Sequence, residues 1–386
     1  NFNYCKLEFS NYICKLNSPY LKYLCMKTKI CHLFLMLFTF LFLCCNSNSP
    51  IIQVKDVREV DFLNNTGDVI KGEFVGEIIG AKDFVLFDSL LIFSTGNPDG
   101  QIQVYSVNSL NNIGLFCKKG RAHNEMLNVD IRTEQVYKKN GNIILIVYEH
   151  PNTIYELDIT NSIKSNRTII ENKFENSAIS EGDVIVLSND YNYRLEYNQN
   201  IYDGDEIKHV PSKYIVYKDD KKTTCDLFAK QLMAVQNDNH KEFPYMGHLQ
   251  KHPKHNLVIK KFTHLDYLLF MDLDKNHFYA IHQKGSLTFS DTYMDEAPWA
   301  LHFTDGAASE KYFMAVYRNG EYAHKTMDGD YHVPEVLIFD WSGKYINGFK
   351  LDRFVTNIEY DETKNVLYAL DYKEQLYAYD LSGLLP

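Results

Sequence analysis

The chain has 386 residues, a formal net charge of −10 and 45% hydrophobic residues, including 28 Tyr and 24 Phe. This length is ample for a large core, and an aromatic share of 14% favours strands. The acidic balance, without a long block of Lys and Arg, argues against a nucleic-acid-binding surface.

An apolar stretch at 30–45 follows Lys27 and Lys29. As a helix it would reach only about 24 Å, which is short of the roughly 30 Å hydrocarbon core of a membrane. A basic start, an apolar centre and a small-residue exit indicate a secretory signal peptide instead. We therefore expect 1–25 to be a non-native upstream extension and 26–44 to be a lipoprotein signal peptide. An uncleaved membrane anchor is the alternative.

The apolar stretch ends in two adjacent cysteines, Cys44 and Cys45. A Cys in this place resembles the bacterial lipobox, where the Cys is acylated and becomes the first residue of the mature chain. We prefer Cys45 to Cys44, because only Cys45 follows a small residue. The resemblance implies a lipid anchor in a bacterial cell envelope, on the periplasmic side or the outer surface, with 45–56 as a polar tether. Whether Cys117 and Cys225 form a disulfide stays open.

One eight-residue pattern recurs through the rest of the chain. Its variants are 102–109, 154–161, 214–221, 268–275, 336–343 and 376–383. Their starts lie on average about 55 residues apart, close to the 40–50 residues of familiar four-stranded propeller blades. Four variants carry an acid at the fifth place: Asp158, Asp272, Asp340 and Asp380.

A second apolar run precedes each octet. These runs are 90–95, 143–149, 183–189, 256–262, 312–318 and 365–371. They are rich in β-branched and aromatic residues and are bounded by turn residues, so each pair of runs predicts the second and third strands of one blade. The Asp-containing ends are expected to turn the chain through side-chain bonds to the backbone. The prediction is an all-β, six-bladed β-propeller over 57–386, with 225–236 as the one helix-like stretch; two unrelated β-domains are the alternative.

The last octet is followed only by Leu384, Leu385 and Pro386, too few residues for an outer strand. If the ring closes, the missing strand comes from the start of the domain, since closure removes an exposed sheet edge. We predict that 57–63 fills this place. Deleting residues 51–65 is then expected to destabilise the fold strongly.

Two segments, 87–95 and 116–131, resemble the first blade of the six-bladed β-propeller lipoproteins of Bacteroidetes, often described as TolB-like. The matching turn residues are Gly120, Arg121, Asn124, Glu125 and Met126, with Ala122 and His123 in place of the usual Gly-Pro pair. The resemblance implies an envelope-anchored binding or scaffold module without a shared catalytic set. For the turn itself we favour a structural role, in which Arg121 and Glu125 pair to fix a loop between blades.

Candidate metal ligands occur in two patterns. The segment 239–256 contains His240, His248, His252 and His255. No Cys or carboxylate completes a familiar zinc or copper pattern there, so we interpret them as solvated loop histidines. Asp203 with Asp205, and Asp328 with Asp330, flank a Gly and offer oxygen ligands to Ca²⁺, although Asp-Gly tight turns are the preferred interpretation. We predict no cofactor, with Ca²⁺ at either Asp pair as the alternative.

No nucleophile-elbow, zinc-protease or phosphate-loop motif occurs in the sequence. We therefore favour a monomeric, membrane-anchored module that binds an envelope protein or glycan without catalysis and does not bind nucleic acid. The alternative is a glycoside hydrolase or lyase with acidic residues in the propeller funnel. The insertion before the fifth octet holds the candidate ligand surface: Tyr322, His324, Tyr331 and His332.

Overall fold

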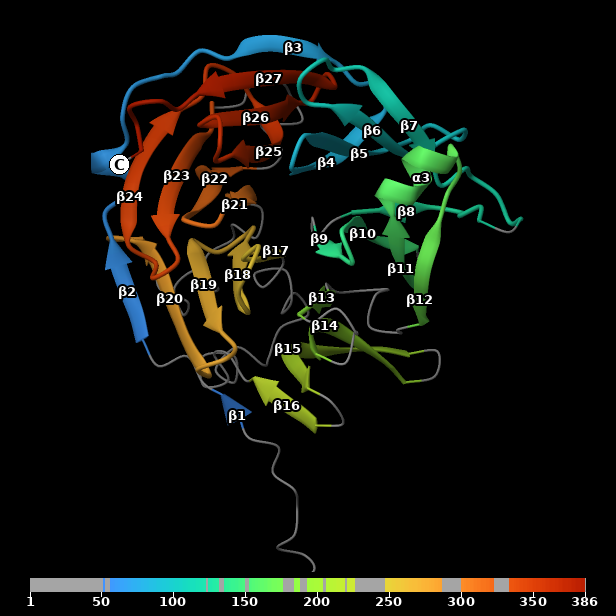
Figure 1. Ribbon diagram of the computed structural model, residues 1–386. Coiled ribbons are helices and arrows are strands. Elements are labelled where there is room, and N and C mark those ends of the chain that lie inside the picture. Colours follow the sequence, from blue (N-terminus) through green and yellow to red (C-terminus); the bar gives the residue numbers. More distant parts are fainter. Residues whose placement is uncertain are drawn as a thin grey trace, which may run out of the picture. The chain divides into compact units, whose positions relative to one another are not determined.

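Figure 1 shows a computed structural model of the chain. The structure describes residues 51–52, 56–122, 124–131, 135–149, 153–175, 184–187, 193–203, 206–218, 221–225, 247–286, 300–322 and 333–385. All of them belong to the unit Pro50–Pro386. Within this part of the chain, no helix combines the length and the apolarity that a membrane crossing requires.

The described strands form six sheets, each built mainly from antiparallel neighbours in sequence. Blade 1 contains β4 (Ala81–Phe87), β5 (Leu90–Thr95), β6 (Ile102–Ser106) and β7 (Asn112–Phe116). Blade 2 contains β8 (Val129–Asp130), β9 (Val136–Lys139), β10 (Asn142–Glu149), β11 (Thr153–Asp158) and β12 (Ile170–Glu175), with helix α3 (Ile159–Ser165) between its last two strands. Blade 3 contains β13 (Val184–Val186), β14 (Tyr193–Asp203), β15 (Glu206–Lys218) and β16 (Lys221–Cys225), beside which lies β1 (Ile51–Ile52).

The other three sheets follow the same plan. Blade 4 contains β17 (Gly247–Lys251), β18 (Leu257–Phe262), β19 (Tyr267–Asp272) and β20 (His277–Gln283), with β2 (Asp56–Val60) as a fifth strand. Blade 5 contains β21 (Ala300–Ala308), β22 (Tyr312–Tyr322), β23 (Glu335–Asp340) and β24 (Tyr345–Lys350). Blade 6 contains β25 (Val355–Asp361), β26 (Val366–Asp371), β27 (Gln375–Asp380) and β3 (Glu73–Glu77).

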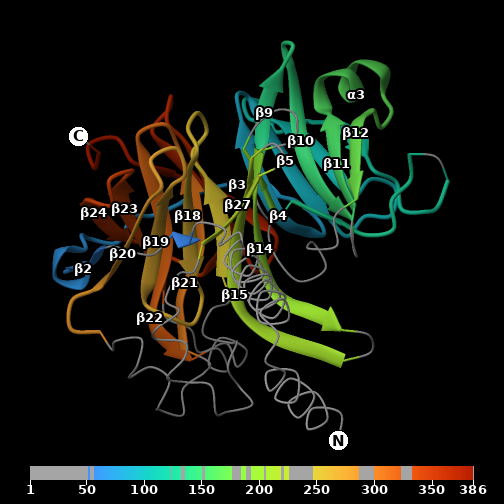
Figure 2. The same cartoon turned by 90° about the horizontal axis from the view of Figure 1, so that it is seen from below.

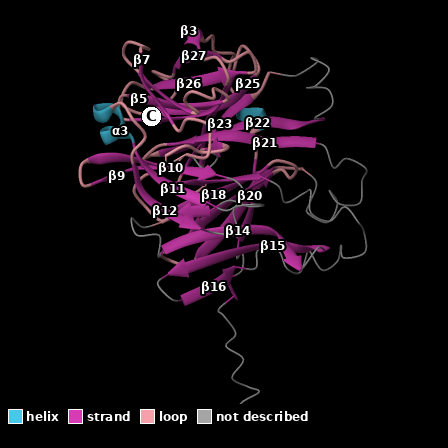
Figure 3. Cartoon of the chain, turned by 90° about the vertical axis from the view of Figure 1, so that its right-hand side faces the viewer, coloured by secondary structure: helices cyan, strands magenta, loops and turns pink. Residues whose placement is uncertain are grey.

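The blades stand in a ring around a common centre (Figure 1), and strands dominate the described chain (Figure 3). In the described residues, an apolar cluster lies at each of the six contacts between neighbouring blades. Ile185 and Leu269 share the cluster between blades 3 and 4, for example, while Phe93 and Leu370 share the one that joins blades 1 and 6. Strands that are apolar on both faces are buried on both faces, which confirms the prediction of a six-bladed β-propeller.

The predicted strand pairs are confirmed in five blades, and blade 3 is the exception. There the run 183–189 forms β13, the innermost strand, and the second strand is β14. The short β13 is buried throughout, whereas β14 has the mixed sequence YRLEYNQNIYD and forms a long hairpin with β15 (Figure 2). The apolar run 183–189 therefore marks the innermost strand of blade 3 and not the predicted second strand.

The predicted turn chemistry of the four octet aspartates is confirmed. Asp272, Asp340 and Asp380 accept backbone hydrogen bonds from Lys275 (3.0 Å), Ser342 (2.8 Å) and Ser382 (2.8 Å). Gly343 and Gly383 have φ of 76° and 90°, the region that glycine enters without strain. Asp158 differs, because it accepts from Asn161 N at 2.8 Å and caps helix α3.

An N-terminal strand closes the ring, but the choice of 57–63 was wrong. The outer strand of blade 6 is β3, which pairs antiparallel with β27 through Gly76 and Leu376. The predicted segment lies instead at blade 4, where β2 pairs parallel with β20. Blade 4 already has four strands, yet its outer edge is open to one more, and the chain meets this edge before it reaches blade 6.

Residues 56–77, which we call the strap, cross the outer edges of blades 4, 5 and 6 in turn (Figure 1). At blade 5, Gly67 N donates to Gly348 O at 2.7 Å and Ile70 N donates to Lys350 O at 2.9 Å. Phe62 is fully buried between blades 4 and 5, 5.5 Å from the ring of Phe339, and its backbone N donates to Gln283 Oε1 at 2.7 Å. The strap thus ties three blades together.

Candidate functional site

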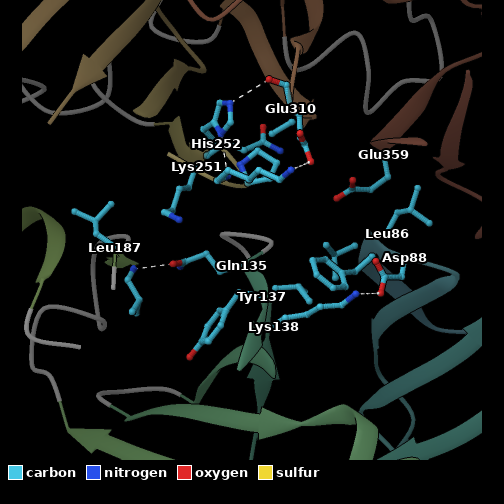
Figure 4. A pocket seen from close by; sticks show the side chains of 18 of the residues that line it. Leu86, Asp88, Gln135, Tyr137, Lys138, Leu187, Lys251, His252, Glu310 and Glu359 are labelled. Atoms are coloured by element: carbon cyan, nitrogen blue, oxygen red, sulfur yellow. Dashed lines mark hydrogen bonds and ion pairs between the residues drawn. The ribbon is translucent and has the colours of Figure 1, made fainter. Parts of the chain in front are cut away.

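A cavity of about 640 Å³ lies where the inner strands of the ring turn into the second strands (Figure 4). Its volume falls within the roughly 300–1,000 Å³ of small-molecule sites. Every blade contributes to its wall, through Leu86 and Asp88 (blade 1), Tyr137 and Lys138 (blade 2), Leu187 (blade 3), Lys251 and His252 (blade 4), Glu310 (blade 5) and Glu359 (blade 6). The cavity is therefore a product of the whole ring.

Two of the lysines on the cavity wall have carboxylate partners. Lys138 Nζ lies 2.8 Å from Asp88 Oδ2, and Lys254 Nζ lies 2.5 Å from Glu310 Oε1. The first ion pair joins blades 2 and 1, and the second joins blades 4 and 5. All four side chains are well exposed, so the pairs orient the rim more than they stabilise it.

His252 is a buried and fixed part of the wall. Its Nδ1 accepts from Lys254 N at 2.9 Å, and its Nε2 lies 3.1 Å from the carbonyl oxygen of Glu310, which requires a proton on Nε2. Burial, and then the neighbouring His255, lower the pKa of His252 to about 4. The ring also packs against Trp341 at 4.6 Å. His252 is thus a neutral structural side chain at physiological pH.

The description of these histidines as solvated was wrong for His252, because the ring is packed between two blades. His248 and His255 are exposed, and His240 lies outside the described residues. Among the residues that the structure describes, no group of three or more His, Cys, Asp or Glu is arranged to hold a metal ion.

Lys251 differs from the other lysines of the cavity. It ends strand β17, is half-buried, and directs its ammonium group into the cavity (Figure 4). Among the described residues no carboxylate pairs with it, and burial lowers its pKa. A cation removed from water without a partner is costly, so among the described residues Lys251 is a candidate contact for a ligand.

The inner part of the propeller also holds a group of polar side chains, which we call the channel cluster: Asp83, Gln250, Lys261, Asp305, Asn357 and Glu359. Gln250 and Glu359 line the cavity, whereas the other four do not. Lys261 Nζ lies 3.6 Å from Asp305 Oδ1 and donates to Gln250 Oε1 at 3.1 Å. Asn357 Nδ2 donates to Asp83 Oδ1 at 2.5 Å. These contacts join blade 4 to blade 5 and blade 6 to blade 1.

The two buried acids of the channel cluster influence each other. Burial raises the pKa of Asp305 to about 6, although Lys261 and the backbone N–H of Ile358, 2.7 Å from Oδ2, favour its charged form. Burial and the nearby Asp305 hold the pKa of Glu359 well above its usual range. Glu359, which lines the cavity, therefore favours its protonated form more than an exposed glutamate does.

Sequence reasoning did not single out Lys251, Lys261, Asp305 or Glu359. The signal was present as a charged residue inside an otherwise apolar strand, such as LVIKKF in β18 and VTNIEYD in β25. A charge in such a position requires a partner or a ligand. Only the ring shows that these strands face one another.

The turn at 120–126, which carries the resemblance to the Bacteroidetes lipoproteins, lies in the connection between blades 1 and 2 and does not line the cavity. Glu125 Oε2 accepts from Ala122 N at 3.0 Å, and Gly120 N donates to Met126 O at 3.2 Å. Asn124 has φ of 67°, and Arg121 is exposed. These bonds fix the loop conformation. The predicted pair of Arg121 and Glu125 is not among the contacts of the described residues, where Glu125 bonds to the backbone instead, and the structural role of the turn stays a prediction.

Several predicted site residues lie outside the described residues: Cys44, Cys45, Asp205, His324, Asp328, Asp330, Tyr331 and His332. So does the helix-like stretch from 226 onward. Tyr322 and Asp203 end strands β22 and β14, and their side chains are not described. Cys117 is a free thiol, buried between blades 1 and 2, so it forms no disulfide with Cys225.

No protein-family model matches the chain, and no curated protein matches it significantly. The resemblance to Bacteroidetes lipoproteins therefore remains a prediction. Among solved structures, the chain is similar to the β-propeller domain of Myceliophteria thermophila Cps50 (Swd1), with 11% identity, a TM-score of 0.42 and coverage of 80% of this chain and 99% of that one. It is also similar to the Neurospora crassa Pan2 WD40 domain, with 11% identity, a TM-score of 0.39 and coverage of 82% and 97%.

Proposed function

We propose that the chain is an envelope lipoprotein, anchored through Cys45 or Cys44, whose propeller binds a glycan without catalysis. The observation that carries the proposal is the cavity to which all six blades contribute. A closed ring of rigid sheets suits the presentation of a binding site, and a compact concavity suits the end of a glycan better than an extended peptide. The apolar stretch before Cys45 supports the anchor.

The binding proposal is tested with the purified chain on a panel of envelope and plant-type polysaccharides. We expect at least one glycan to bind, and Ala308→Trp to abolish its binding by filling the cavity. Lys373→Trp is the matched control, because Lys373 is exposed on the turn between β26 and β27 and does not line the cavity. Capture of a protein partner, with no glycan bound, would reject the proposal.

The anchor is tested by mass spectrometry of the chain from a membrane fraction. We expect an acylated N-terminal peptide that begins at Cys45 or Cys44, and loss of membrane association when both are changed to Ser. A mature chain that still carries residues 26–44 would contradict the proposal.

A second candidate function, a glycoside hydrolase or lyase, is favoured by two side chains of the cavity wall whose pKa values are shifted. Glu359 has a raised pKa and Lys251 a lowered one within a single cavity, and such groups often mark catalytic sites. Of the three carboxylates in the channel cluster, Glu359 lines the cavity, whereas Asp83 and Asp305 do not. Polysaccharide breakdown that is lost in Glu359→Gln would establish the enzyme, whereas intact glycan after binding supports the binding module.

A further inference from the structure

We propose that the cavity selects a glycan that carries a carboxylate, namely a uronic-acid sugar, with Lys251 as the residue that contacts this group and Glu359 as a second donor. The inference rests on the proposed function of glycan binding and adds the charge class of the ligand. It depends on the distribution of donors and charges around the cavity.

The lysines that line the cavity differ in whether a carboxylate pairs with them. Lys138 and Lys254 are paired with Asp88 and Glu310, so their charges are already compensated. Lys251 is less exposed than either, yet none of the described residues offers it a carboxylate. A ligand carboxylate would supply the missing partner in a partly desolvated site, where a charge-assisted hydrogen bond is strong.

The Glu359 carboxyl lies in surroundings that disfavour its charged form. Asp305 has its own cation in Lys261, 3.6 Å away, while Glu359 lies buried beside this charged pair. Backbone N–H groups of Leu86 and Tyr360 hold the carboxyl in place. Burial and the nearby Asp305 raise the pKa of Glu359, which favours its protonated form, and a protonated carboxyl in the cavity wall can donate a hydrogen bond to a ligand. The side chains of Lys251 and Glu359, from blades 4 and 6, both line the cavity (Figure 4).

This donor set fits a carboxylate better than it fits the other charged ligands. A cationic ligand would have to enter beside the uncompensated Lys251. A phosphate or sulfate is usually held by several donors, and Arg is favoured because its planar group binds two oxygens at once. The described residues that line the cavity include no Arg. A single carboxylate with neighbouring hydroxyl groups, as in a uronic acid, matches one ammonium and one acid donor.

The test uses the full chain and pairs of ligands that differ in the carboxylate alone. Galacturonan, alginate and hyaluronan are each compared with their carboxyl-reduced forms, next to neutral glucans and an acidic hexapeptide. We expect at least one acidic glycan to bind the wild type at least tenfold more tightly than its reduced form. Lys251→Met should remove this preference and leave the weaker binding of the reduced form unchanged.

Three further variants separate a specific contact from a general effect of charge. Lys373→Met removes an exposed lysine that does not line the cavity, and we expect it to keep the preference. Glu359→Gln keeps a neutral donor and should retain binding of the acidic glycan, whereas Glu359→Leu removes the donor and should weaken it severalfold.

The outcomes distinguish this inference from the proposed function on which it rests. Equal binding of the acidic and reduced forms, binding of neutral glucans alone, or an unchanged preference in Lys251→Met would overturn the inference and leave glycan binding standing. Binding of the acidic peptide with no glycan bound would overturn both. An acid preference that depends on Lys251 supports both.

Discussion

The strap at the outer rim and the channel cluster at the centre both join neighbouring blades, but they do so with opposite chemistry. The strap uses backbone pairing along β2 and β3 and one deeply buried ring, Phe62. The channel cluster uses an ion pair and amide bonds, such as Lys261–Asp305 and Asn357–Asp83. The propeller is therefore held by a buried aromatic side chain and backbone pairing at its outer rim, and by polar side-chain bonds near its centre.

The contacts of the strap and those of the channel cluster are expected to contribute differently to stability. Burial of an aromatic ring stabilises a protein without regard to protonation. A buried ion pair, in contrast, gives up most of its Coulomb energy to desolvation and contributes little net stability, although breaking it is costly. Retaining polar groups in the channel cluster is thus better explained by the cavity beside them than by the stability of the ring.

The largest effect on stability is expected from the rim. Phe62→Ala should lower the free energy of unfolding by about 3–5 kcal/mol, because it leaves a cavity between blades 4 and 5. Chemical denaturation followed by fluorescence measures the change. Phe74→Ala is the control on the same strap: this ring is 60% exposed, so its loss should cost less than about 1 kcal/mol. Equal losses in both variants would show that Phe62 is not an anchor.

A somewhat smaller effect is expected in the channel cluster. Lys261→Met should lower the free energy of unfolding by about 3 kcal/mol, because it leaves the charge of Asp305 buried without a cation. The double variant Lys261→Met/Asp305→Leu should recover most of this loss, since an apolar pair replaces the ion pair. A double variant as unstable as the sum of the single ones would mean that the pair itself stabilises the ring.

The smallest effect is a change in pH dependence. The pKa of Asp305 is raised from 3.8 to about 6, so the folded state holds its proton more tightly than the unfolded state does. The resulting stability is complete below pH 3.8 and is lost as the pH rises through about 6. Asp305→Asn should therefore gain stability relative to the wild type over this window, by at most about 1.4 kcal/mol per pH unit.

Urea denaturation at several pH values between 4 and 7 measures this difference. The comparison with the wild type is needed because buried histidines act in the opposite sense: burial lowers the pKa of His252 and of His302 to about 4, and their contribution is lost as the pH falls. Parallel stability curves for the wild type and Asp305→Asn would show that Asp305 titrates alike in the folded and unfolded states.

The number of blades and most of their strands follow from local patterns in the sequence. Strand formation and turn chemistry are local, so apolar runs and the turn residues Asp272, Asp340 and Asp380 already mark where each strand ends. The failure at β13 and β14 came from the same local rule, because an apolar run reports burial and not the position of a strand within its sheet.

How the propeller closes and where the cavity lies depend on contacts between distant parts of the chain. Segments 57–63 and 73–77 are both at sheet edges, and the choice between them depends on which edge each one meets. These contacts join residues more than about 200 positions apart in the sequence. Lys251 and Glu359 likewise line one cavity because inner strands of different blades converge on one centre. Local patterns carry no information about such convergence, since it arises when separate sheets pack face to face.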